Sequence, residues 1–131
     1  MRLRDFCFLV VTIAMFSGCA GSPLRKDLRQ VAVEHPTCEG KEDCELKWAR
    51  AVQWITKNSS FRIRLMNDIL IETYPSVGSL DAFIAYRITR VPLGQEKYRL
   101  EIQAACGNLF GCVKNPGSAM VELSQYIRTG Q

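Results

Sequence analysis

The chain has 131 residues, of which 17 are lysine or arginine and 13 are aspartate or glutamate, giving a formal net charge of +4. This length fits one domain with a single hydrophobic core, and two domains would be cramped. No run of basic residues interleaved with aromatic residues stands out. Composition therefore gives no sign of nucleic-acid binding and permits only a modest attraction to anionic surfaces.

The first 18 residues have the three-part layout of an export signal. Two arginines lie near the start, an apolar run covers residues 6–16, and two small residues precede Cys19. A permanent membrane-spanning helix needs about 20 apolar residues, so this run is too short to be one. We therefore expect residues 1–18 to be removed during export, which leaves 113 of the 131 residues. A secretory signal in which Cys19 is incidental is the alternative.

The segment Phe16-Ser17-Gly18-Cys19 resembles the lipobox of bacterial lipoproteins, in which a bulky apolar residue and two small ones precede an acylated cysteine. The resemblance covers only residues 1–20. It implies diacylglyceryl transfer to the Cys19 thiolate, a good nucleophile, and lasting membrane attachment through several acyl chains, palmitate among them. For a Gram-negative lipoprotein, Ala20 implies sorting to the outer membrane. The protein is then lipid-anchored there on the periplasmic side.

The remaining cysteines form two pairs, each with five intervening residues: Cys38 with Cys44, and Cys106 with Cys112. An even number of cysteines in an oxidising compartment is typical of a disulfide framework. Loop-closure entropy favours longer loops, but encounter favours near neighbours, and Gly107 and Gly111 allow the tight turn that the second pair requires. We expect the two local pairs. A four-cysteine zinc site is the alternative, although zinc ligand pairs usually have two to four residues between them.

The periodicity of apolar residues divides the mature chain into a lipidated tether, residues 19–36, and one small domain, residues 37–131. A period of 3.6 predicts helices and a period of two predicts strands. Asn115 and Pro116 suit the start of the last helix, and Gly130 suits its end. The predicted order is a helix over 43–57, strands over 61–65, 69–74, 82–91 and 97–104, and a helix from about 116 to 129.

This order predicts an α+β fold, a two-layer sandwich built as a helix, a three- or four-stranded antiparallel meander and a second helix. A sheet with one apolar face has to be covered, and two amphipathic helices are long enough to cover it. The charged face of the sheet, or part of it, is expected to stay open to solvent.

The sequence shows no catalytic constellation. The single histidine, His35, lies next to Pro36 in the predicted tether, without a rigid frame that would let it act as a base. No glycine-rich phosphate loop and no histidine–carboxylate metal set is present. We therefore expect a protein that is not an enzyme and that needs no cofactor or metal.

Two groups of side chains are candidates for binding. Leu109 and Phe110 lie in the short loop that the second disulfide would hold rigid, and pre-organised apolar loops bind at low entropic cost. The alternative is that these two side chains pack back onto the core. The second group could form a basic patch on the open sheet face, or only a solvated surface: Arg62, Arg64, Lys97 and Arg99.

The leading hypothesis is a non-enzymatic accessory or protein-binding module, anchored in the envelope through Cys19 and acting through contacts with a protein partner. The alternative is a binder of an anionic envelope ligand, such as peptidoglycan, lipid or glycan, through the basic face.

Overall fold

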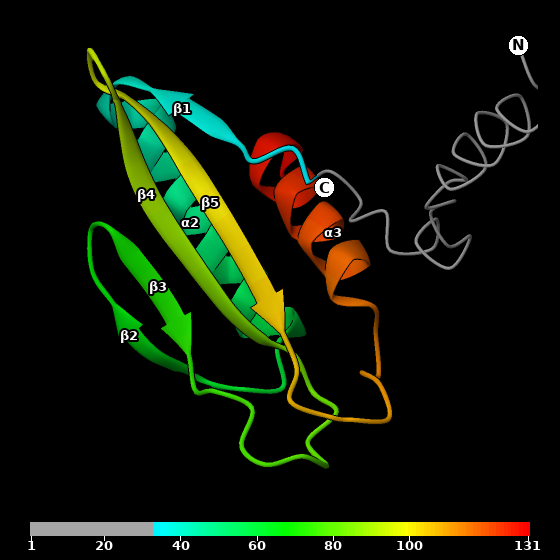
Figure 1. Ribbon diagram of the computed structural model, residues 1–131. Coiled ribbons are helices and arrows are strands. Elements are labelled where there is room, and N and C mark those ends of the chain that lie inside the picture. The colour runs from blue at the N-terminus through cyan, green and yellow to red at the C-terminus, as the bar shows by residue number, and fades with distance from the viewer. Residues whose placement is uncertain (1–32) are drawn as a thin grey trace, which may run out of the picture.

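The structure is a computed structural model that describes residues 33–131 and contains five strands and two helices (Figure 1). The predicted signal, Cys19 and most of the predicted tether lie outside the described residues. In chain order the elements are β1 (Thr37–Glu39), α2 (Gly40–Asn58), β2 (Ile63–Met66), β3 (Leu70–Thr73), β4 (Ala85–Gly94), β5 (Lys97–Ala105) and α3 (Pro116–Thr129).

The five strands form one antiparallel sheet in the order β1-β5-β4-β3-β2. The long β4–β5 hairpin lies at its centre, with Ile88 opposite Ile102. The predicted α+β class is confirmed. The predicted count of three or four strands is too low because β1, only three residues long, has no periodic pattern and pairs with β5.

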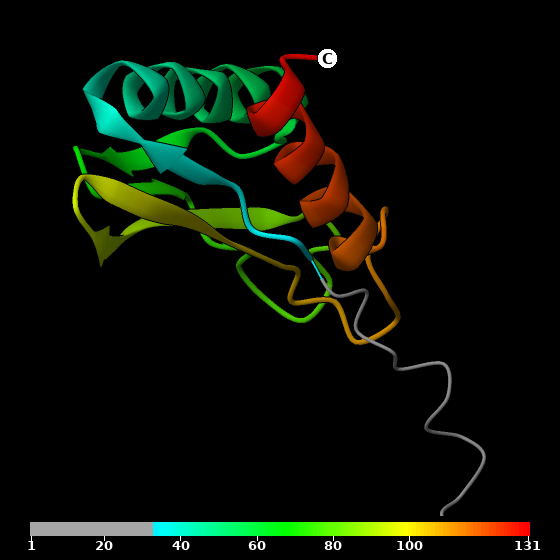
Figure 2. The ribbon, with the colours of Figure 1, turned by 90° about the horizontal axis from the view of Figure 1, so that it is seen from above.

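Both helices cover the same face of the sheet (Figure 2). Alternate residues of the strands point to that face, as the pleat of a strand requires, so their apolar side chains meet those of the helices. The largest fully buried apolar side chains of this core are Ile55, Ile71, Ile88, Leu100, Ile102, Leu123 and Ile127.

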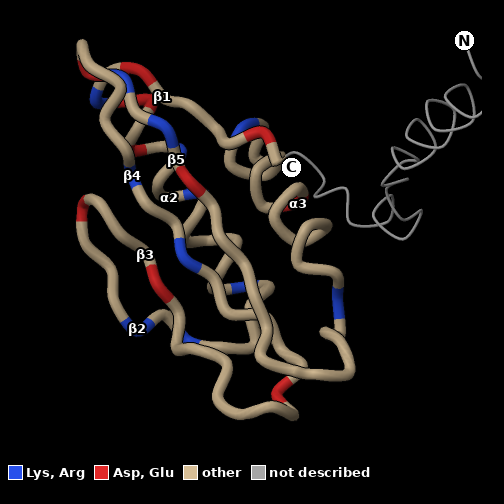
Figure 3. The backbone as a smooth tube through the Cα atoms, viewed as in Figure 1, with Lys and Arg blue, Asp and Glu red and all other residues tan. Residues whose placement is uncertain are grey.

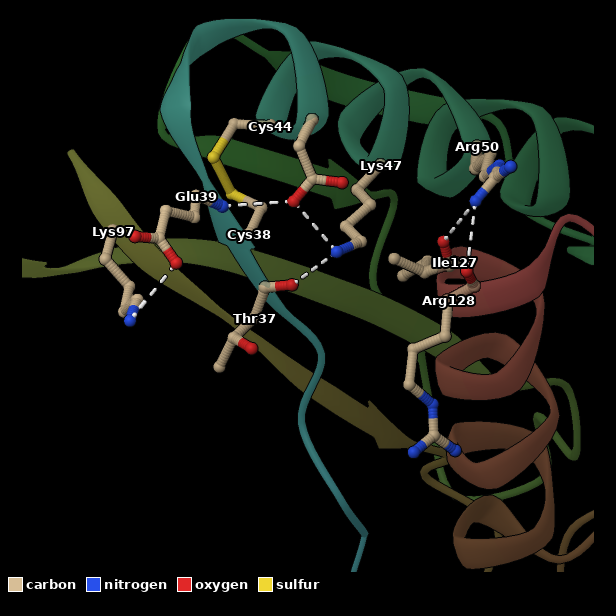
Figure 4. A network of polar contacts seen from close by, with 10 residues as sticks. Thr37, Cys38, Glu39, Cys44, Lys47, Arg50, Lys97, Ile127 and Arg128 are labelled. Carbon is tan, nitrogen blue, oxygen red and sulfur yellow. Dashed lines mark hydrogen bonds and ion pairs between the residues drawn. A yellow bond between two sulfur atoms is a disulfide. The ribbon is translucent and has the colours of Figure 1, made fainter.

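Helix α2 is longer than predicted because β1 leads directly into it. The Asp43 carboxylate accepts hydrogen bonds from the Glu39 N–H (3.0 Å) and from Lys47 Nζ (2.9 Å), and the latter bond in particular lowers the pKa of Asp43. Lys47 Nζ also donates to the Thr37 carbonyl at 2.8 Å (Figure 4). The Cys38–Cys44 disulfide closes the same corner. Strand β1 and the first turns of α2 are therefore one cross-linked unit.

Helix α3 begins and ends where the sequence predicts. The Asn115 side chain accepts a hydrogen bond from the Ser118 N–H, and Gly130 ends the helix in the left-handed conformation at φ 80°. Arg50 of α2 donates from Nη1 to the carbonyl oxygens of Ile127 (3.2 Å) and Arg128 (3.1 Å), shown in Figure 4. This guanidinium satisfies carbonyls that the end of a helix leaves free.

The predicted tether extends too far into the domain. Pro36 is fully buried, and its carbonyl oxygen accepts a hydrogen bond from the Leu100 N–H at 2.8 Å. The Nδ1 atom of His35 accepts a hydrogen bond from the Ile102 N–H at 3.1 Å, so this histidine is held in place rather than free. Ser124 donates to the carbonyl oxygen of Glu34. Residues 34–36 therefore belong to the folded domain.

None of the helices within residues 33–131 is long and apolar enough to cross a membrane.

Both local disulfides are present, in the pairing that we favoured from the sequence. Cys38 and Cys44 are 2% and 3% exposed, whereas Cys106 and Cys112 are only partly buried. The two loops have equal sequence separation, so loop closure stabilises each by a similar amount, about 2–3 kcal/mol. The two disulfides therefore differ in how deeply their sulfur atoms and side chains are buried, and not in loop length.

We predict that Cys38→Ala/Cys44→Ala lowers the free energy of unfolding by about 1–2 kcal/mol more than Cys106→Ala/Cys112→Ala, because the first pair is more deeply buried and leaves the larger cavity. Urea unfolding of both variants measures the difference. Equal losses, or a larger loss for the second pair, would contradict this assignment.

Candidate functional site

Two loops lie side by side at one end of the sheet, one between β3 and β4 and the other between β5 and α3 (Figure 1). They carry five large apolar side chains that are mostly exposed to solvent, which we call the loop platform: Val77 (73%), Leu80 (74%), Leu109 (81%), Phe110 (89%) and Val113 (68%). The alternative in which Leu109 and Phe110 tuck back onto the core is therefore wrong.

Hydrogen bonds join the two loops directly. The Leu109 N–H donates to the Ser79 carbonyl (3.1 Å), and the Val113 N–H donates to the Ala82 carbonyl (3.0 Å). The Asn108 side-chain amide donates to the Leu80 carbonyl at 2.8 Å. Since each bond links one loop to the other, the two loops act as one unit.

Gly107 allows the loops to approach closely. A Cβ at this position would lie 2.9 Å from the carbonyl oxygen of Gly78, closer than side chains tolerate. The Gly107 N–H also donates to Ser76 Oγ at 3.0 Å. The sequence indicated that Gly107 helps to close the disulfide loop, and the structure adds that it makes room for the facing backbone. The Cys106–Cys112 disulfide then closes the loop.

The platform is almost uncharged, and Figure 3 shows its loops largely free of charged residues. Within these loops, residues 74–84 and 106–115, Lys114 is paired with Glu122, and the only carboxylate is Asp81. Its two oxygens accept hydrogen bonds from the backbone N–H groups of Val77 (3.2 Å) and Phe83 (3.1 Å). The carboxylate therefore organises its own loop.

The four basic candidates do not form one patch, which corrects that part of the sequence prediction. Arg62 and Arg64 lie at or next to β2, whereas Lys97 and Arg99 lie on β5, and β3 and β4 separate the two strands. The sequence could not show this because it does not fix the order of the strands.

Carboxylates also neutralise most of these basic side chains. Ion pairs join Arg64 to Glu72 (2.8 Å), Lys97 to Glu39 (3.3 Å) and Arg99 to Glu101 (2.6 Å). Arg87 donates to Glu72 as well, and this bond, with Arg64 nearby, lowers the pKa of Glu72. The described sheet face is therefore a mixed-charge surface rather than a basic one.

Arg90 points toward the helices, an arrangement that the sequence did not indicate. It shares the core-facing side of β4 with Tyr86 and Ile88, and its guanidinium carbon lies 4.6 Å from the ring centroid of Trp48 and 5.8 Å from that of Tyr98. These two aromatic rings account for its position through cation–π contacts.

A cleft of about 520 Å³ lies between α2 and α3. Its polar groups already have partners: Arg50 donates to carbonyls of α3, and the Tyr126 hydroxyl donates to Gln53 at 2.9 Å. Elsewhere in residues 33–131, no three His, Cys, Asp or Glu side chains are grouped so that they could hold a metal ion.

Sequence reasoning found Leu109 and Phe110 but missed Val77, Leu80 and Val113. The loop over residues 75–84 carries Pro75 and Gly78, which indicated a turn, but its apolar residues follow no period. Only the contact between the two loops brings these residues to the same end of the sheet.

No protein-family model matches the chain, and neither the curated proteins nor the solved structures contain a significant match to it.

We predict that Leu109→Ser/Phe110→Ser changes the free energy of unfolding by no more than about 0.5 kcal/mol, because neither side chain packs on the core. Leu123→Ala, at a fully buried position, is the control and should cost about 2–5 kcal/mol. Thermal or urea unfolding compares them. A loss above about 2 kcal/mol for the double variant would show that the loop packs inward.

Proposed function

We propose that this protein is a lipid-anchored envelope protein that acts by binding and not by catalysis, with the loop platform as its contact surface. The observation that carries the proposal is the exposure of five apolar side chains on two loops that hydrogen bonds and a disulfide hold together. Exposed apolar surface is costly in water, so a group of such side chains on two joined loops points to a contact.

The geometry favours binding through an apolar contact over binding of an anionic polymer. The sequence left both a protein partner and an anionic envelope ligand open. An anionic ligand needs unpaired positive charge, and of the four basic candidates only Arg62 forms no ion pair with a described residue. The platform needs no charge, because burial of apolar side chains supplies the favourable free energy.

The proposed location rests on the lipobox-like segment ending at Cys19, with Ala20 after it, and on the two disulfides. Disulfides persist in oxidising compartments such as the periplasm. An anchor at the periplasmic side of the outer membrane is compatible with them.

Metabolic labelling with an alkyne palmitate analogue tests the anchor. We expect the label on the wild-type protein and on Cys7→Ser, because Cys7 leaves with the signal, and no label on Cys19→Ser. Mass measurement should find a product that begins at position 19. An unlabelled wild-type protein that retains residues 1–18 would contradict the proposal.

A further inference from the structure

We propose that the loop platform inserts into the boundary between headgroups and acyl chains of the membrane that carries the anchor. This inference rests on the proposed function, because it takes Cys19 as the lipid attachment. It goes beyond the anchor by giving the folded domain a second contact with the lipid and therefore a fixed orientation.

The exposed side chains of the loop platform suit a contact with fluid lipid better than a contact with a shaped protein pocket. Its side chains belong to two neighbouring loops, and Leu109 and Phe110 are among the most exposed large apolar residues of the described chain. Protein hot spots usually lie in well-packed pockets that need a complementary shape. Lipid accepts projecting side chains without such a shape.

Backbone N–H groups of the two loops already have internal hydrogen-bond partners, as a low-dielectric environment requires. Backbone N–H groups that face apolar surroundings need internal partners. The N–H groups of Gly107, Leu109, Phe110 and Val113 all donate within the two loops, and the Phe110 N–H does so to Asn108 Oδ1 at 2.7 Å. The disulfide loop itself contains no charged residue. Shallow burial would therefore leave few polar groups unsatisfied.

The surroundings of the platform suit a membrane interface. Tyr74, about half exposed, begins the first loop, and its N–H donates to the carbonyl oxygen of Arg62 at 3.0 Å. The Arg62 side chain is exposed and forms no ion pair with any described residue, unlike Arg64. Aromatic and basic side chains are enriched where protein meets headgroups.

The chain length upstream of the described residues allows the contact. Cys19 lies 14 positions before Val33, which corresponds to an r.m.s. distance of about 20 Å for an unstructured chain. Glu34 contacts Ser124, which lies eight residues along α3 from Pro116, or about 12 Å at the helical rise. The anchor thus keeps the platform within reach of the lipid, so even a weak affinity suffices.

Lipid quenching of a tryptophan placed on the platform tests this inference. The full-length protein, purified with its anchor, is reconstituted into vesicles of phosphatidylethanolamine and phosphatidylglycerol that contain brominated phospholipid. Phe110→Trp places the probe on the platform. Leu93→Trp places it at the β4–β5 turn, at the opposite end of the sheet, as the matched control (Figure 1). The wild-type signal from Trp48 and Trp54 is subtracted.

We expect brominated lipid to quench the tryptophan at position 110 at least about twofold more than that at position 93, since interfacial insertion brings a side chain about 5–10 Å into the boundary. If both variants bind the vesicles but tryptophan is quenched equally at the two positions, or not at all at position 110, the inference is overturned. The proposed anchor is then left intact. In that case, a protein that crosslinks to position 110 in cells would be identified as the partner bound at the loop platform. Failure of either variant to float with vesicles would overturn the proposed anchor and this inference together.

Discussion

The junction between the two loops is the constraint on which the exposed apolar surface depends. Leu109 and Phe110 would be free to fold back over the end of the core if their loop were held only at its two ends. Backbone hydrogen bonds to Ser79 and Ala82 fix the disulfide loop against its neighbour, and Gly107 lets the two backbones meet. On this joined pair of loops the side chains of Leu109 and Phe110 are 81% and 89% exposed.

The rest of the fold fixes where the two loops begin and end. The pairing of Ala85 with Ala105 sets the start of β4 beside the end of β5, so the first loop ends where the second begins. The Asn115 cap fixes the start of α3 and with it the end of the second loop. The loops therefore inherit their position from the central hairpin and from α3. A surface placed in this way can meet lipid without first being ordered, which reduces the entropic cost of binding.

Hydrophobic periodicity and capping residues were enough to predict the two helices, four of the strands and the α+β class. Local spacing was enough to predict both disulfides. Prediction failed where the partner is distant in sequence: β1 and His35 are held by β5, which lies 58 to 67 positions further along the chain. It failed for the basic residues because periodicity does not give strand order. The exposure of Leu109 and Phe110 depended on the facing loop, which no local pattern describes.

Amide hydrogen exchange at Leu109 and Val113, followed by NMR in the full-length protein, tests the junction most directly. Both N–H groups are predicted to exchange at least about a hundredfold more slowly than in an unstructured peptide, because each donates to the facing loop. Exchange of both amides at the unstructured rate would show that the loops are not joined and that the platform is not pre-formed.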